Sequence, residues 1–392
     1  MKNGKNVWLL MVCQALTMSI PSFMVFLASI IGQTLAPDPG YATLPVGAFL
    51  LGSALGTLPV ILAMRRWGRK AIFIMCSLIA GIGGLLAIAA LMKSHFPLFV
   101  AAGMVLGFGL AAGQQYRFAA MESVDAPDMP KAASRVLIGG IIAAFLGPEI
   151  AIRGESLLGT PYVGSFALLL VVIAMATLVL LFFVEPQSAN QSAQGEARPW
   201  GNILSQPVIW VAVLSGLTAF AVMSTVMTAT PLHMHFENGH SLVDTKWVIQ
   251  SHIVAMFLPS LVVPMIVSRI GEVGLIGLGV GAFVASLAVI FSDYEFINYW
   301  LSLVLLGLGW NFLFIGGTTL LPQGYRDSER FKVQAFNDFT IFGVQSTGAL
   351  MAGWLLARFG WQYLLLGMLP ILAMLVLTVV YWRTARASVV SA

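Results

Sequence analysis

The stretch that decides the fold is the basic hexapeptide Arg65-Arg66-Trp67-Gly68-Arg69-Lys70, because apolar runs flank it on both sides, at 41–64 and 71–92. A helix needs roughly 20 predominantly apolar residues to cross the hydrocarbon core of a bilayer. Such runs must be helical, since a lone segment satisfies its own backbone groups in lipid only as a helix. The hexapeptide is therefore predicted to be a short loop at the membrane surface between two transmembrane helices.

The composition extends this prediction to the whole chain. Of its 392 residues, 59% are hydrophobic and only 9% are charged, whereas charged residues make up about 25% of an ordinary globular domain. The two cysteines give no disulfide framework. The sequence has no phosphate-binding P-loop, no dinucleotide-binding glycine pattern and no basic stripe with interleaved aromatic residues. These patterns exclude an ATP-driven pump, a soluble enzyme and a nucleic-acid-binding protein.

The apolar runs predict an all-α integral membrane protein with twelve transmembrane helices. The predicted spans are 7–30, 41–64, 71–92, 97–120, 134–153, 161–184, 207–232, 246–268, 273–292, 297–321, 333–357 and 361–382. Of the 20 Lys and Arg residues, only Lys93, Arg153, Lys246 and Arg358 fall on the side opposite the N-terminus. Because basic residues collect in cytoplasmic loops, both termini are predicted to be cytoplasmic. We expect a multi-pass protein of a bacterial inner membrane.

A polar stretch divides the chain into two halves. Residues 185–205 are rich in Ser, Gln and Asn and are predicted to form a flexible cytoplasmic linker. This linker separates six-helix halves at 1–184 and 206–392. Pro21 near the end of the first helix matches Pro231 near the end of the seventh, which is a weak sign of internal repetition. Two parallel repeats with a substrate site at their interface are a transporter architecture.

Two pairs of soft metal ligands lie in adjacent predicted helices. Met223 and Met227 are four residues apart in the seventh helix. His252 and Met256 are four apart in the eighth, so each pair shares one helix face. In an antiparallel hairpin Met227 is expected to lie level with His252, and the remaining two level with each other. Thioethers and an imidazole in a membrane suit Cu(I), and the alternative is that the methionines pack in the core.

A second group of metal-ligating residues follows the first pair along the chain. His233, Met234 and His235 lie near the outer end of the seventh helix. We expect this group to capture a metal ion at a polar mouth above the deeper thioether site. The alternative is that the two histidines are solvated loop residues.

Ionisable residues near or within spans are candidates for gating or ion coupling. Arg117, near the inner end of the fourth helix, is expected to face the central cavity or to reach the cytoplasmic surface. Glu149 and Arg153, at the outer end of the fifth helix, are expected to form an ion pair, unless Glu149 is a protonatable coupling carboxylate. Asp338, at the start of the eleventh helix, is expected at the inner interface, paired with a basic residue of the preceding loop.

A further set of residues would suit an organic cargo. Gln114 and Gln115 in the fourth helix and Trp310 and Asn311 in the tenth carry amide and aromatic groups. These side chains could line a central cavity. The alternative for the tenth helix is close packing, because small residues surround the Trp-Asn pair.

The hexapeptide at 65–70 resembles the loop signature of the major facilitator superfamily, and the resemblance extends over the whole chain. Arg65 stands where that signature usually has Asp, and Ile61 stands where it has its first Gly. The resemblance implies two six-helix halves that expose a central site to each side of the membrane in turn.

The segments Met223-Ser224-Thr225-Val226-Met227 and His252-Ile253-Val254-Ala255-Met256 resemble the paired MxxxM and HxxxM motifs of the CcoA-like copper importer family. This resemblance implies a secondary transporter that imports copper for cytochrome oxidase assembly. The copper ion would be cargo, with no permanently bound cofactor. The protein is expected to act as a monomer in the lipid bilayer, without nucleic acid.

Two other cargoes remain open. The same family includes members assigned to riboflavin uptake, so a riboflavin-like organic-solute permease is the alternative to copper import. Glycines at 139–140 and 147 in the fifth helix faintly resemble the antiporter signature of drug exporters. A proton-coupled drug exporter is therefore the third interpretation.

Overall fold

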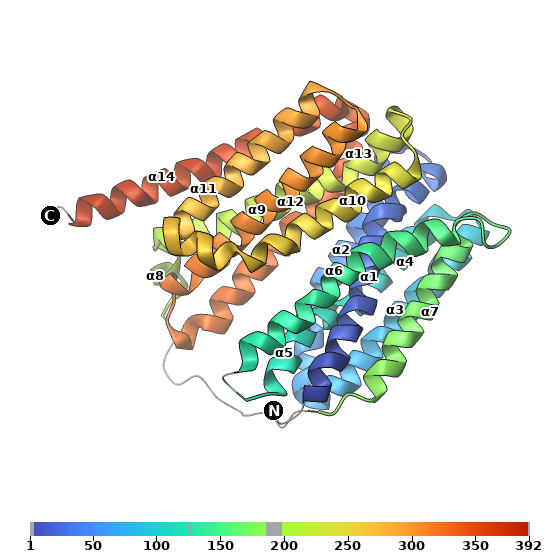
Figure 1. Ribbon diagram of the computed structural model, residues 1–392, viewed down its shortest axis with the longest axis horizontal. Coiled ribbons are helices and arrows are strands. Elements are labelled where there is room, and N and C mark those ends of the chain that lie inside the picture. Colours follow the sequence, from blue (N-terminus) through green and yellow to red (C-terminus); the bar gives the residue numbers. More distant parts are fainter. Residues whose placement is uncertain (1–3, 126–127, 186–197, 391–392) are drawn as a thin grey trace.

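The computed structural model describes residues 4–125, 128–185 and 198–390, which form helices joined by short loops and contain no strand. The helices form two bundles, one from each half of the chain (Figure 1). The start of α1 and the end of α14 lie toward the same end of the molecule. We call this end the inner end, because the basic loops predict that it faces the cytoplasm. The opposite end is the outer end.

The first bundle holds the first six predicted spans. Its elements are α1 (Gly4–Leu35), η1 (Pro39–Tyr41), α2 (Leu44–Trp67), α3 (Arg69–Met92), α4 (Phe96–Leu110), η2 (Ala111–Gln115), α5 (Tyr116–Glu122), α6 (Met129–Gly154) and α7 (Val163–Leu181). The fourth predicted span is thus not one uniform helix. The 3₁₀ segment η2 interrupts it between α4 and α5, and such a break often marks a hinge.

The second bundle holds the last six spans. Its elements are α8 (Trp200–Leu204), α9 (Pro207–Leu232), the π-helix η4 (His233–Glu237), α10 (Leu242–Phe257), η5 (Leu258–Leu261), α11 (Val263–Ser292), α12 (Phe296–Leu320), η6 (Leu321–Gly324), η7 (Asp327–Glu329), α13 (Arg330–Leu366) and α14 (Leu369–Val390). Gly271 in α11 and Gly360 in α13 have φ values of 69° and 80°. Only glycine adopts this backbone conformation readily, so these two residues bend the chain between consecutive spans.

Within the described residues, nine segments are long and apolar enough to cross a membrane. One of them, Lys332–Thr384, contains two predicted spans that meet at Gly360. The fifth and eighth spans are absent from the nine, although α6 and α10 occupy those positions. At the eighth position α10 ends at Phe257 and the 3₁₀ segment η5 follows it. The all-α architecture of twelve spans in two six-helix halves is confirmed.

The predicted loop at 65–70 is reduced to a tight inner turn at Gly68, because α2 continues to Trp67 and α3 begins at Arg69. Gly68 has a φ of 80°, and the Glu185 carboxylate accepts hydrogen bonds from the backbone N–H groups of Arg69 and Lys70, both at 2.8 Å. A carboxylate at a helix N-terminus is stabilised by the unpaired N–H groups and the helix dipole. The Arg69 guanidinium binds the Glu122 carboxylate through two nitrogens. The turn therefore ties α3, α5 and the end of α7 together at the inner surface.

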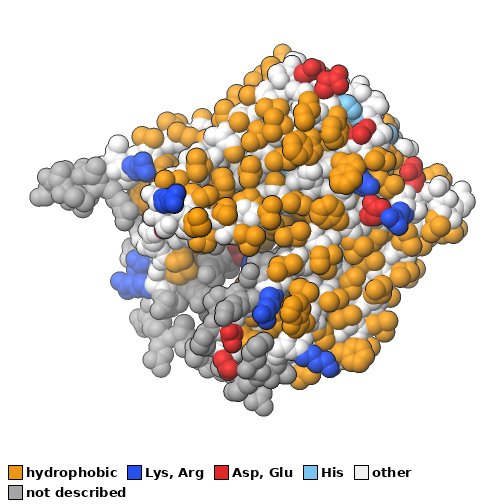
Figure 2. Space-filling model, viewed as in Figure 1, with side chains coloured by type: hydrophobic (Ala, Val, Ile, Leu, Met, Phe, Trp, Pro, Cys, Tyr) orange, Lys and Arg blue, Asp and Glu red, His pale blue; other side chains and the backbone are white. Residues whose placement is uncertain are grey.

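The surface between the two ends is apolar. Large hydrophobic side chains cover the face seen in Figure 2, and charged groups gather toward its edges. Leu85, Leu178 and Leu377 are each more than half exposed on helices α3, α7 and α14. Such side chains would be unfavourable in water but suit the hydrocarbon of a bilayer.

The end of the predicted linker is anchored to the second bundle. Residues 186–197 lie outside the described residues, so the boundaries of the linker at 185–205 stay a prediction. Arg198 binds the fully buried Glu329 carboxylate, with Nε at 2.6 Å from Oε1 and a second nitrogen at 2.7 Å from Oε2. Lys332 donates to the Arg198 carbonyl and lies over the Trp200 ring. Residues 198–204 are therefore a fixed part of the inner surface of this bundle.

This anchor predicts that Glu329→Gln lowers the thermal stability of the protein in detergent. The Arg198 guanidinium holds the pKa of Glu329 well below its usual range, so the folded state favours the ionised carboxylate. Cys13 and Cys76 are free and buried, so a thiol-reactive dye reports unfolding. The matched control is Glu295→Gln, which changes an exposed carboxylate at the start of α12.

The same anchor has a defined pH dependence. Because the folded-state pKa of Glu329 lies below its unfolded value, its stabilisation is present at neutral pH and is lost as the pH falls below the usual glutamate range. The Tm difference between the parent and Glu329→Gln should therefore shrink on acidification. Equal Tm values at neutral pH would contradict the anchor.

Candidate functional site

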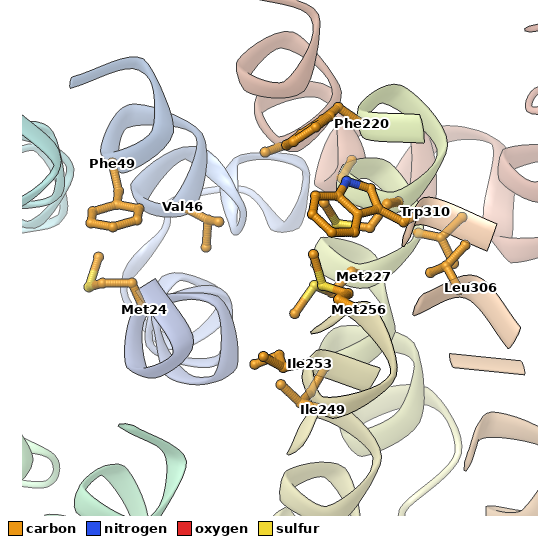
Figure 3. Packing of buried hydrophobic residues seen from close by; sticks show 14 of the residues in the cluster. Met24, Val46, Phe49, Phe220, Met227, Ile249, Ile253, Met256, Leu306 and Trp310 are labelled. Atoms are coloured by element: carbon orange, nitrogen blue, oxygen red, sulfur yellow. The ribbon is translucent and has the colours of Figure 1, made fainter. Parts of the chain in front are cut away.

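Three helices of the second bundle carry the candidate site. α12 packs against both α9 and α10, whereas α1 and α2 of the first bundle lie across the interface. Figure 3 shows this arrangement, with Val46 and Met24 on the side of the first bundle and Met227, Met256 and Trp310 on the other. Residues from both bundles belong to one buried apolar cluster. The candidate site therefore lies where the two halves meet.

The four predicted soft ligands are all buried in this region. Met223, Met227 and Met256 are less than a tenth exposed, and His252 is fully buried. In the view of Figure 3, Met227 from α9 and Met256 from α10 point to the space beside the Trp310 ring. α9 and α10 are each packed on α12. The two predicted helix faces are thus held by a third helix, which the hairpin prediction did not include.

The His252 ring is fixed in one tautomer. Its Nδ1 lies 2.7 Å from the carbonyl oxygen of Leu303 in α12, and a carbonyl can only accept, so Nδ1 carries the proton. Its Nε2 is buried and has no hydrogen-bond partner among the described residues. A neutral imidazole that donates one N–H to a backbone carbonyl and keeps the other nitrogen free has the usual form of a metal ligand.

The surroundings limit which metal could bind. Within the described part of the chain, no three His, Cys, Asp or Glu side chains gather in a way that could hold a metal ion. A site here would rely on the thioethers of Met223, Met227 and Met256 with a single imidazole. Such a donor set suits Cu(I) and does not suit Zn²⁺ or Mg²⁺.

Aromatic rings surround Trp310 on α12. The Phe314 ring stacks on the indole at 5.1 Å and 20°, and the Phe220 ring meets it edge-on at 5.2 Å. Phe257, at the end of α10, lies 6.0 Å from the same indole, and Phe342 of α13 meets Phe220. Sequence reasoning found Trp310 but missed its neighbours. The i,i+4 spacing of Trp310 and Phe314 could have indicated that these two rings lie on one helix face.

Two polar atoms in this aromatic group lack partners. Trp310 is 6% exposed and Asn311 is 2% exposed. Trp310 Nε1 and Asn311 Oδ1 make no hydrogen bond to any described residue. The predicted cavity residues of the fourth helix, Gln114 and Gln115, lie in η2 of the other bundle. The aromatic and amide groups of α12 are thus buried beside the end of α10.

The second predicted metal group forms part of the packed outer end of the second bundle. His233 is buried, stacks on the Trp361 ring at 4.4 Å and bonds the Tyr299 hydroxyl through Nδ1. Met234 is fully buried, and the His235 ring bonds the carbonyl of His240. In this structure these side chains serve packing and hydrogen bonding. Their predicted role in metal capture stays a prediction.

The outer ends of the two halves are joined by polar contacts. The Glu149 carboxylate accepts from Arg153 in the same helix, at 2.8 Å, and from Lys246 in the other half, at 2.9 Å. Gln250 donates to the Phe145 carbonyl, and Thr43 Oγ1 accepts from the Gly353 amide at 2.9 Å. We call the Glu149–Lys246 pair the outer latch. The predicted Arg153 ion pair exists, but the cross-half partner Lys246 was missed.

The inner ends carry opposite charges that do not touch. Arg117 on α5 and Asp338 on α13 interact electrostatically, yet they form no ion pair in this structure. The Arg117 guanidinium lies over the Phe118 ring, and Asp338 accepts a hydrogen bond from Asn337. The Arg330 side chain, one of the loop partners expected for Asp338, lies outside the described residues. Both charged side chains are accessible, one on each half.

The fold and this site between two halves define a membrane transporter. The chain belongs to the Major Facilitator Superfamily, because the model of that family matches residues 7–344. It is therefore a multi-pass transporter and not an enzyme.

Relatives of known sequence support the same assignment. The riboflavin transporter RfnT of Brucella anthropi is 33% identical over 380 residues, which cover 96% of this chain and 95% of that protein. An uncharacterized MFS-type transporter of Bacillus subtilis, YdeG, is 31% identical and covers 92% of this chain and 88% of its own length.

Solved structures share the fold. A crystal structure of a mutant of the nucleoside transporter NupG has a TM-score of 0.78 at 13% identity and covers 96% of this chain and 99% of its own. The structure of the POT family transporter PepTSo has a TM-score of 0.76 at 11% identity and covers 98% of both chains. At such identities the likeness shows the shared fold alone.

The outer latch predicts that Lys246→Met opens the outer end. Loss of the ammonium removes the cross-half ion pair with Glu149, so the population with an open outer end should rise. A Val46→Cys reporter, with Cys13 and Cys76 replaced by Ala, measures this opening, because Val46 is fully buried near the outer end of α2. A shift of about 1 kcal/mol gives roughly fivefold faster labelling by a membrane-impermeant maleimide.

The control for this experiment is Arg153→Met. It removes a cation from the same carboxylate but breaks only a contact within α6. Labelling of the reporter should match the parent. Equal labelling rates in the Lys246 and Arg153 variants would refute the latch.

Proposed function

We propose that this chain is a secondary transporter for a small, uncharged, planar organic solute of the flavin class. The observation that carries the proposal is the buried aromatic group around Trp310, with the unpartnered polar atoms Trp310 Nε1 and Asn311 Oδ1. A flat heteroaromatic ring is recognised by stacking and by a few placed hydrogen bonds. The 33% identity to a riboflavin transporter over nearly the whole chain supports the same class.

The charge distribution favours an uncharged cargo. α9 and α12 contain no Asp, Glu, Lys or Arg, and the charged residues of α10 are Asp244 and Lys246 near its outer end. Moving an ionised group from water into such surroundings is costly unless an opposite charge receives it. A neutral ring system avoids this cost, whereas a phosphorylated one does not.

The gating residues fit alternating access. The outer latch is closed, and the Arg117–Asp338 charges stand apart at the inner end. We assign to this second pair the role of an inner gate, which forms when the outer latch opens. Glu149 already binds two cations, which favours a latch over proton coupling and weakens the drug-exporter interpretation.

Riboflavin uptake into proteoliposomes tests the proposal. The parent should accumulate riboflavin, and Trp310→Leu should reduce the initial rate about tenfold or more, because the stacking surface and its buried area are lost. The matched control is Trp67→Leu, which changes an exposed tryptophan at the inner end of α2 in the other bundle. The proposal fails if the parent shows no riboflavin uptake above empty liposomes.

Copper import is the second candidate, because one specific observation favours it. His252 presents a buried, unpartnered Nε2 in a fixed tautomer, on the same α9–α10–α12 group as three thioethers. The ion would pass among these soft ligands during alternating access and supply cytochrome oxidase assembly. Trp310 and Asn311 would then serve packing.

Cellular copper accumulation separates the two candidates. If copper is the cargo, His252→Ala and Met227→Ala should lower accumulation about tenfold or more, since each removes one of few ligands. Trp310→Phe, which keeps the ring, should leave it unchanged. Unchanged accumulation in both ligand variants would exclude the copper site.

A further inference from the structure

We propose that Trp310 and Asn311 read the imide edge of the flavin ring, so that binding requires an unsubstituted ring N–H flanked by a carbonyl. This inference rests on the proposed function and names the chemical group that the site selects. It follows from which donors and acceptors the buried side chains have already used.

Trp310 offers one donor in a fixed direction. Rings from three helices, Phe220 of α9, Phe257 of α10 and Phe314 of α12, contact its indole at 5.1 to 6.0 Å. These contacts restrict the rotation of the ring, and Nε1–H has no acceptor among the described residues. An indole nitrogen can only donate. The matching ligand atom is therefore a carbonyl oxygen or another acceptor.

Asn311 offers one acceptor. Its Nδ2 donates to the Met256 carbonyl and to Ser260 Oγ, both at 2.7 Å, so both amide hydrogens are used. The opposite amide orientation would set Oδ1 against the Met256 carbonyl, two acceptors without a proton between them. Oδ1 is therefore the free atom, and it has no partner among the described residues. The matching ligand group is an N–H or O–H donor.

The two side chains that carry the free atoms both contact the end of α10. Asn311 and Trp310 are neighbours on α12, and both meet the chain at the end of α10, through Met256 and Phe257 respectively. A buried polar group without a partner costs about 1–3 kcal/mol. A ligand that supplies an acceptor beside a donor removes both costs together. The imide of a flavin, with N–H next to C=O, is a neutral group that carries this pattern on a planar heteroaromatic ring.

No charge is required for this recognition. The two side chains are neutral, and α12 contains no ionisable Asp, Glu, Lys or Arg. A site built to hydrogen-bond a specific N–H rejects an analogue that lacks it far more strongly than an apolar pocket rejects a missing methyl group. Methylation of the ring imide nitrogen removes the donor and keeps the ring, its charge and its side chain.

The test is equilibrium binding of riboflavin and 3-methylriboflavin to the purified full-length protein. We expect the parent to prefer riboflavin by about tenfold or more, since one hydrogen bond to a buried acceptor is lost in the methyl analogue. Asn311→Ala removes the acceptor and leaves space for the methyl group, so the two Kd values should become equal. The control Asn202→Ala, an exposed residue of α8, should keep the parent's preference.

If Asn311→Ala does not fold, the binding of both flavins to Trp310→Phe is the second test. This variant keeps an aromatic ring but removes the donor, so it should weaken both flavins by the same factor and leave their ratio unchanged. Equal Kd values of the two flavins for the parent, or a preference that persists in Asn311→Ala, would overturn the inference and leave the proposed function standing. Absence of binding of either flavin by the parent would overturn both.

Discussion

The absence of water from the bilayer core is the constraint on which the rest of this structure depends. Each backbone group must be satisfied within its own helix, and each buried side-chain donor or acceptor must find a partner in the protein or in its cargo. Most buried polar groups of this chain do so, as His233 does at the outer end. Of the buried atoms without a partner among the described residues, those of Trp310, Asn311 and His252 lie on α10 and α12, and it is there that we propose the functional centre.

The same constraint explains where the charges lie. Arg69, Glu122 and Glu185 tie the inner turns of the first half together, and Arg198 with Glu329 does so in the second. Each bundle is thereby a rigid unit whose charged groups sit at its ends. At the outer end the bundles meet through apolar packing and through a few polar contacts, which include the outer latch. In alternating access, contacts between the halves would break at the outer end of the interface while others form at its inner end.

The sequence predicted the twelve spans and the burial of the paired soft ligands, because apolar length and i,i+4 spacing are local properties. It could not predict which helix separates α9 from α10, since packing partners depend on the whole bundle. Lys246 was predicted only as the outer first residue of the eighth span, yet it reaches across the interface to Glu149. The start of α10 at Leu242 was missed although Ser241 and Asp244 form a capping box. The same difference applies to the predicted cargo. The spacing of the Met and His residues is local and favoured copper, whereas the aromatic group around Trp310 forms only through the packing of α9, α10 and α12.

The most direct measurement is the fluorescence of riboflavin on titration with the purified protein. Stacking of the isoalloxazine ring against the aromatic group around Trp310 should quench the flavin in a saturable way. Trp310→Leu should abolish the saturable component. Flavin fluorescence that stays unchanged over the whole titration, with the protein folded and binding Cu(I), would contradict the account.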